Sequence, residues 1–305
     1  MTSAWAALAP VFALVALGFV LKRIGFPGAG FWPVAEKLTY FLLFPALLFE
    51  SLATAELEFT TAGPMAAALA AGVLATAALA LGLKPLLALD GPAFTSVFQG
   101  AIRPNTYVGI AVALGVWGRH GAVLAAIAIA VVVPLVNLLC VAVLARFGGR
   151  SGRGPGQFIA AVLGNPLILA CAGGALVNLS GLSLPGWSVA TLELAGKGAL
   201  LLGLIAVGAA LEPRRLRSDV AALAWVALLK LGLFPALTFA AASLLGVPGP
   251  AWAIAVMYAG LPVSASSYVL ASQMGGDTAL IAGALTATTL LAALTLPALL
   301  ILLGL

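Results

Sequence analysis

The stretch "QGAIRPNTYVGIAV", residues 99–112, places Arg103, Pro104 and Asn105 side by side inside a long apolar segment. Proline has no N–H, so Pro104 leaves the carbonyl of Gly100 without its helical partner and predicts a helix break. If the segment crosses a membrane, burying Arg103 costs about 2.5–3.5 kcal/mol even on the lenient insertion scale. Irregular backbone at that depth occurs where it lines a polar cavity or is buried in protein, so a functional site is expected here.

The composition predicts an all-α membrane protein. Of the 305 residues, 63% are hydrophobic and 8% are charged, whereas a soluble domain carries about 25% charged residues. Apolar runs of about 20 residues, long enough to cross the hydrocarbon core, recur along the chain, and they do not alternate as the strands of a barrel do. The net charge of +5 comes with basic residues in short loops, which predicts a lipid bilayer and no nucleic acid as partner.

Turn-forming stretches such as "GFPGAG", "GLSLPG" and "GVPGP" divide the chain into ten apolar segments. We expect one membrane helix in each segment. Their ranges are 4–22, 31–53, 62–86, 92–118, 121–146, 157–180, 187–211, 218–246, 250–274 and 277–304.

The basic residues of the loops predict the orientation. After the odd-numbered segments come Lys22, Arg23, Lys84, Arg146, Arg150, Arg153, Arg214, Arg215 and Arg217, whereas only Arg119 follows an even-numbered segment. The positive-inside rule places the first group in the cytoplasm and both termini outside, with segment 4–22 retained as a first span. The acidic residues Glu56 and Glu58 then lie outside. We expect a multi-pass protein of the bacterial inner membrane.

An internal repeat relates the two halves. With an offset of 158 residues, "GPAF" at 91–94 meets "GPAW" at 249–252, Pro104 meets Pro262, and Gly118 meets Gly276. Residues 1–150 and 156–305 therefore form two five-helix repeats. Five is an odd number, so the second repeat is inverted, as in many secondary transporters, whose substrates bind near the midplane between broken helices.

Pro262 predicts a second break, because it deprives the carbonyl of Tyr258 of its helical partner. The half-helix that follows each break presents free N–H groups, which attract anions, and the guanidinium of Arg103 suits a carboxylate. The sequence leaves two roles open for Arg103: contact with a substrate, or structural pairing with a glutamate of another span. The candidate binding residues are Arg103, Pro104, Asn105, Thr106, Asn137, Pro262, Val263, Ser264, Ser266 and Ser267.

Five stretches resemble the auxin efflux carrier family, the bacterial relatives of the plant auxin exporters in the bile acid/sodium symporter-like superfamily. They are "KLTYFLLFPALLFESLA" (37–53), "IRPNTYVGIAVALGVWG" (102–118), "GNPLILACAGGAL" (164–176), "LLLGLIAVGAAL" (200–211) and "AGLPVSASSYVLASQMGGD" (259–277). The resemblance implies a homodimer with scaffold helices 1, 2, 6 and 7 (4–53, 157–211) and a mobile elevator-type transport bundle, helices 3–5 and 8–10 (62–146, 218–304). It also implies that helices 4 and 9 cross at their prolines.

The resemblance further implies carriage of small organic anions, carboxylates such as malonate, malate or auxin-like acids. The family's crossover asparagine corresponds to Asn105, and its counterpart in the second repeat is Val263. No cofactor is expected, although transport is open to coupling with H⁺ or Na⁺.

Several other charged residues fall within the apolar segments. Glu193 and Lys197 are four residues apart and are expected to pair on one helix face, as a structural or a proton-linked pair. Lys230 is expected to extend its ammonium toward the cytoplasmic surface. Glu36 and Glu50, near the ends of segment 31–53, are expected to be interfacial. Cys140 and Cys171 are expected to be small core residues.

Two other function classes are disfavoured, and a third stays open. The single histidine, His120, lies in an outer loop, and no acidic or Cys/His cluster supports an intramembrane enzyme. A channel needs polar residues along several spans, whereas polarity here is confined to one layer. The alternative to a carrier is a membrane sensor or binding protein of transporter ancestry that does not transport.

Overall fold

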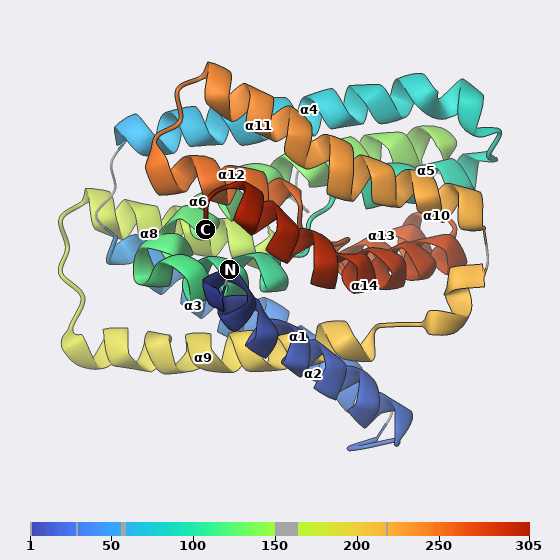
Figure 1. The fold of residues 1–305 in the computed structure, drawn as a ribbon. Helices are drawn as coiled ribbons and strands as arrows, with labels where there is room; N and C mark the ends of the chain where they lie inside the picture. The colour runs from blue at the N-terminus through green and yellow to red at the C-terminus, as the bar shows by residue number, and fades with distance from the viewer. Residues whose placement is uncertain (1, 29, 56–58, 150–163, 218) are drawn as a thin grey trace.

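The structure, a computed structural model, describes residues 2–28, 30–55, 59–149, 164–217 and 219–305. These residues form helices joined by short loops, and no strand occurs among them (Figure 1). Seven helical stretches of this part are long and apolar enough to cross a membrane: Trp5–Arg23, Phe31–Ala53, Thr60–Leu87, Thr106–Phe147, Gly186–Ala209, Val220–Leu244 and Thr278–Leu302. The chain is therefore an α-helical, multi-pass membrane protein.

The described helices match the predicted apolar segments to within a few residues, apart from a short helix at Pro213–Arg217. Residues 157–163 of segment 157–180 lie outside the described part of the chain. In the first half the helices are α1 (Thr2–Arg23), α2 (Phe31–Leu38), η1 (Thr39–Leu43), α3 (Phe44–Ala53), α4 (Phe59–Leu87), α5 (Gly91–Ile102) and α6 (Thr106–Phe147). In the second half they are α8 (Pro166–Leu179), α9 (Gly186–Ala209), η2 (Pro213–Arg217), α10 (Val220–Ala227), η3 (Leu228–Leu233), α11 (Phe234–Leu244), α12 (Gly249–Ala259), α13 (Ser266–Met274) and α14 (Thr278–Leu302).

Helix α6 bends sharply at Gly118, whose φ of 60° and ψ of −147° lie outside the helical region. Glycine tolerates this left-handed φ because it has no Cβ. The bend lies where the sequence separates segment 92–118 from segment 121–146, so this boundary is confirmed although the helix is formally continuous.

Two predicted helices contain a wide π-type turn that the sequence analysis missed. Segment η1 joins α2 to α3, and η3 joins α10 to α11. Each π-type turn is followed directly by a Phe-Pro pair, Phe44-Pro45 or Phe234-Pro235. A proline lacks the N–H that would continue the α-helical ladder, and the wider turn absorbs the disturbance without ending the helix.

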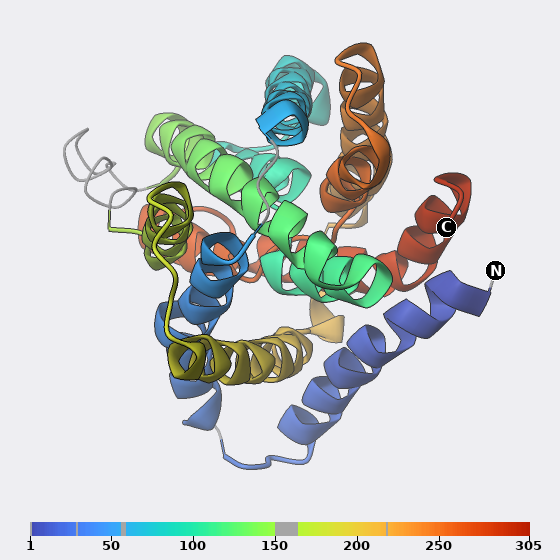
Figure 2. The same cartoon turned by 90° about the vertical axis from the view of Figure 1, so that its left-hand side faces the viewer.

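The helices pack as two groups. Helix α9 packs on α1 and on α3, and α3 packs on α8; α4, α5, α6, α11, α12 and α14 form the other group, and α6 also contacts the first group. In both views α4 and α11 lie at one edge of the molecule and α9 at the opposite edge, and the two chain ends lie near each other (Figures 1 and 2). Within the first group α1 and α9 approach backbone to backbone, because a Cβ on Gly18 would collide with the carbonyl of Ile205 and one on Gly208 with that of Val15.

Candidate functional site

Two broken helices cross at the centre of the molecule. Helix α5 ends at Ile102 and α6 begins at Thr106, while α12 ends at Ala259 and α13 begins at Ser266. Both predicted breaks are thus confirmed. The two extended pieces form an antiparallel bridge between Pro104 and Val263.

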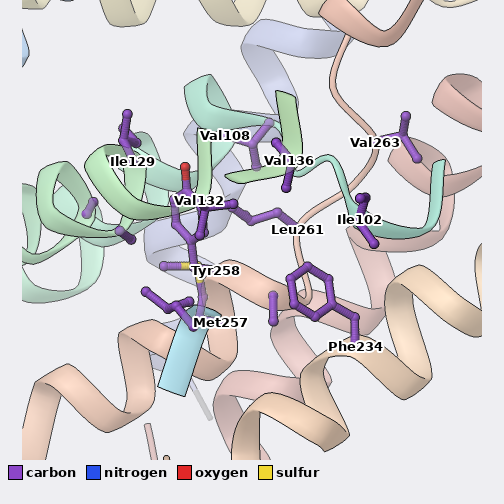
Figure 3. Close-up of a cluster of buried hydrophobic side chains, with 14 of the residues drawn as sticks. Ile102, Val108, Ile129, Val132, Val136, Phe234, Met257, Tyr258, Leu261 and Val263 are labelled. Carbon is purple, nitrogen blue, oxygen red and sulfur yellow. The ribbon is translucent and has the colours of Figure 1, made fainter. Parts of the chain in front are cut away.

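Hydrogen bonds between the two extended pieces replace those that the breaks remove. The N–H of Asn105 donates to the carbonyl of Pro262 at 2.9 Å, and the N–H of Ser264 donates to that of Arg103 at 3.1 Å. Figure 3 shows apolar side chains of both broken helices, among them Ile102, Val108, Leu261 and Val263, gathered around the crossing.

Polar side chains complete the crossing. The Oδ1 of Asn105 caps α6 by accepting from the N–H groups of Tyr107 at 3.2 Å and Val108 at 3.3 Å. The N–H of Val263 donates to Oγ1 of Thr288, on α14, at 3.0 Å. The buried Nδ2 of Asn105 has no hydrogen-bond partner, so the crossing retains an unused donor.

Arg103 is the one cation of the crossing loops, and its side chain is buried, with 7% of the residue exposed. Its Nη2 donates to Oγ of Ser266 at 3.0 Å, and Ser266 in turn shares a hydrogen bond of 2.9 Å with Ser264. Nε and Nη1 have no hydrogen-bond partner; the buried thiol of Cys140 lies beside the guanidinium, but sulfur is a weak partner.

The structure bears on one of the two roles that the sequence left open for Arg103, structural pairing with a glutamate. In the described part of the chain no carboxylate lies within ion-pair distance of its guanidinium. Structural pairing with a glutamate is therefore wrong for these residues. A buried guanidinium without a counter-charge favours an anion that comes from outside the protein.

A cavity of about 50 Å³ lies against this guanidinium. Six candidate residues line it: Arg103, Pro104, Thr106, Asn137, Ser264 and Ser266. The other candidates lie behind this wall: Asn105, Pro262 and Val263 build the crossing, and Ser267 is fully buried in α13 with an unpartnered Oγ.

The sequence analysis missed three polar residues of the cavity wall. Glu36, Tyr40 and Tyr107 line the cavity, and Glu36 is therefore not a merely interfacial residue. Glu36 and Tyr40 are four residues apart and share a helix face, which was the signal available in the sequence. Tyr40 also accepts a hydrogen bond of 3.2 Å from Nδ2 of Asn165, the residue that caps α8.

Two larger cavities lie near the first one. A cavity of about 330 Å³ shares Glu36 and Ala265 with it, and one of about 310 Å³ shares Lys22, Ala209 and Glu212 with the second. The last cavity is lined by Lys22, Arg23 and Arg214. The three cavities thus adjoin one another between the crossing and a wall that holds three basic residues and Glu212.

An ion cluster closes the other end of the helices. Arg119 pairs with Glu50 through Nη2 and with Glu193 through Nη1 at 3.1 Å, and its Nη2 also donates to Thr54 at 2.7 Å. The cluster joins the bend of α6 to α3 and α9. Glu50 lies about 20 Å beyond Glu36 at the helical rise of 1.5 Å per residue, so the cluster and the cavities are at opposite ends.

Two further expectations about charged residues are wrong. Glu193 pairs with Arg119 and not with Lys197, which is exposed on α9, so the pair proposed for proton linkage does not form. Lys230 does not reach the surface but is fully buried in η3. Glu56, Glu58, Arg150 and Arg153, which entered the topology prediction, lie outside the described residues.

The described residues contain no group of three or more His, Cys, Asp or Glu side chains placed to hold a metal ion. In comparisons with known proteins, no family model and no curated protein matches the chain. The site therefore has to be interpreted from its own geometry.

Proposed function

We propose that the chain is a secondary transporter that moves small organic anions by alternating access around the crossing of α5–α6 with α12–α13. The observation that carries the proposal is the guanidinium of Arg103, buried beside a cavity, with two nitrogens unpartnered and no counter-charge in the described residues. A carboxylate matches the planar fork of the guanidinium with two parallel hydrogen bonds. Malonate, malate and auxin-like acids are the candidate substrates.

The N-terminal ends of the half-helices also favour a negatively charged ligand. Helices α6 and α13 both begin beside the cavity, and the N-terminal end of a helix carries a partial positive charge. Thr106, Ser264 and Ser266 add neutral hydrogen-bonding groups to the cavity wall. The site thus combines a full charge, two helix dipoles and hydroxyl groups, and it contains a single carboxylate, Glu36, in its wall.

The architecture proposed with this function is ten spans in two inverted repeats, residues 1–150 and 156–305. The antiparallel contact of Pro104 with Val263, one residue from its repeat partner Pro262, supports this symmetry. The nearness of the two chain ends in both views fits an even number of crossings. The resemblance to the auxin efflux carrier family supports the same arrangement, with a homodimer held by the scaffold helices.

We propose that the conformation is open to the cytoplasm. The adjoining cavities lie between the crossing and Lys22, Arg23 and Arg214, which the positive-inside rule assigns to the cytoplasmic side. The cluster of Arg119, Glu50 and Glu193 then closes the outer side. An inside-negative potential drives an anion outward with about 2.3 kcal/mol per charge per 100 mV, so export is the direction that needs no coupled ion.

The test combines binding with transport. Purified protein is heated with malonate, malate, monocarboxylates and indole acetate, and each anion that raises the melting temperature is assayed for flux in liposomes. Arg103→Gln is expected to weaken anion binding about tenfold or more, because it removes a charge-assisted pair. Arg146→Gln, at the far end of α6, serves as the matched control and is expected to bind like the original chain.

Three results would contradict the proposal. Unchanged anion binding by the Arg103→Gln variant would show that Arg103 is not part of the anion site. Failure of every anion to stabilise the protein would contradict small organic anions as the substrate class. Stabilisation by an anion that never crosses the liposome membrane would favour the alternative, a binding protein or sensor that does not transport.

A further inference from the structure

A second buried basic residue, Lys230, has no part in the proposed anion site. The residue lies in η3 and is 0% exposed. Within the described part of the chain no carboxylate lies within ion-pair distance of its Nζ. Full burial of an ammonium group costs several kcal/mol unless polar or aromatic groups replace its water, so the surroundings of Nζ indicate its role.

The amino group of Lys230 binds the end of a broken helix. Its Nζ donates to the carbonyl oxygen of Ala259 at 2.7 Å and lies 4.5 Å from the centre of the Phe234 ring. Ala259 is the last residue of α12. In an unbroken helix its carbonyl would accept from the N–H of Val263, but that N–H donates to Thr288 instead.

The position that Nζ occupies is one that attracts cations. The C-terminal end of a helix carries a partial negative charge on its free carbonyl groups. In transporters with broken helices, such half-helix ends and unwound carbonyls coordinate the coupling cation, Na⁺ or H⁺. The face of an aromatic ring adds attraction for an ammonium group.

We propose that Lys230 is a tethered cation that permanently occupies the cation site at the C-terminal end of α12, so that anion binding at Arg103 proceeds without Na⁺. The consequence for transport rests on the proposed function, whereas the cation site itself does not. On this proposal, Lys230 supplies a fixed positive charge at the C-terminal end of α12. Arg103 supplies a second one beside the N-terminal ends of α6 and α13.

The first experiment needs no variant. The melting temperature of the original chain, and its affinity for a stabilising anion, are measured in NaCl and in choline chloride at equal concentration. Both are expected to be the same in the two salts. An anion affinity that falls about tenfold or more in choline would show a separate Na⁺ site and overturn the proposal.

The second experiment empties the site. Lys230→Ala removes the ammonium and leaves space beside Ala259, so the variant is expected to melt at a lower temperature and to be restored in part by ethylammonium or propylammonium chloride. Lys230→Met fills the space without a charge and is expected to be destabilised but not restored. Lys84→Ala is the matched control: Lys84 lies over the rings of Phe94 and Phe147, at 5.5 and 5.0 Å, away from either break, and no restoration is expected.

The outcomes separate the two proposals. A Lys230→Met variant that melts and binds anions like the original chain would show that the charge is dispensable and would overturn the tethered cation. The tethered cation is also overturned if alkylammonium ions restore the melting temperatures of both the Lys84→Ala and the Lys230→Ala variants, or of neither variant. Restoration of Lys230→Ala alone, in a chain that binds no anion, would uphold the cation site and contradict the proposed transport function.

Discussion

The backbone N–H of Asn105 donates to the carbonyl of Pro262 at 2.9 Å, so each of the two broken helices completes the hydrogen bonding of the other. A break that stood alone would leave unpaired N–H and C=O groups, which are costly away from water. Because the two breaks satisfy each other, they form one structural unit, and substitutions at the crossing are expected to affect stability and anion binding together.

Replacement of Asn105 tests this coupling. Asn105→Ala removes the cap of α6 and is expected to lower the free energy of unfolding by about 1 kcal/mol and to weaken the stabilisation by anions. Asn105→Asp keeps the cap but places a negative charge beside Arg103, so stability is expected to be retained while anion binding is lost. Chemical unfolding and anion titrations measure the two effects. Asp90→Ala, which removes the cap of α5, is expected to change stability alone. If the Asp90→Ala variant lost anion binding as much as the Asn105→Ala variant, a local role of Asn105 in anion binding would be contradicted.

Thr288 is expected to stabilise the fold because its hydroxyl accepts a hydrogen bond from the N–H of Val263. Thr288→Val leaves the buried N–H of Val263 without a partner and is expected to cost about 1–3 kcal/mol of unfolding free energy. Thr76 is the matched control, because it is equally buried and its hydroxyl donates to the carbonyl four residues earlier, as that of Thr288 does. Thr76→Val is expected to have little effect. Equal costs for the two variants would show that the bond to Val263 contributes nothing.

The ion cluster at the closed end is expected to depend on one of its two carboxylates. The side chain of Glu50 is 7% exposed, whereas that of Glu193 is 43% exposed. Arg119→Ala leaves Glu50 buried without a cation and is expected to cost about 2 kcal/mol, less than for a fully buried pair because Arg119 is half exposed. Glu193→Gln is expected to cost less than about 0.5 kcal/mol. The reverse order in unfolding experiments would show that the exposed pair holds the cluster.

Close packing of α1 on α9 is expected to depend on Gly18. Gly18→Ala places a Cβ against the carbonyl of Ile205 and is expected to cost about 1–3 kcal/mol through overpacking. Gly82→Ala in α4, where a Cβ meets nothing within 4 Å, is expected to be neutral or slightly stabilising. Melting temperatures of the two variants decide the matter, and a stable Gly18→Ala protein would mean that the helices can separate at no cost.

The sequence predicted the broken helices because proline acts locally. Pro104 and Pro262 remove a hydrogen bond wherever the surrounding helix lies, so the breaks could be placed to within a few residues. The helical segments were predicted for a similar reason, because a run of apolar residues of sufficient length forms a helix in lipid irrespective of its neighbours. The boundary between segments 92–118 and 121–146 was predicted, whereas the bend at Gly118 within a formally continuous helix was not.

The contacts of charged side chains could not be predicted, because they depend on which helices meet. Glu193 has Lys197 as a neighbour on its own helix, but the fold brings Arg119 to it from α6. Lys230 was assigned to the surface because a lysine near a helix end usually reaches water, whereas the broken end of α12 supplies a carbonyl within the protein. The π-type turns were missed because they leave the helix continuous and change only its pitch.

The glycines between α1 and α9 have a consequence for motion. Contacts made by side chains have alternative rotamers, so they can be rearranged in small steps. A contact formed by main-chain atoms has no alternative rotamers. The two helices can therefore slide past each other only by a large step, which would bring residues with Cβ atoms into the contact. Spin labels on α1 and α9 should therefore keep one narrow separation in every state, while a pair that links α9 to α6 should report any change of access.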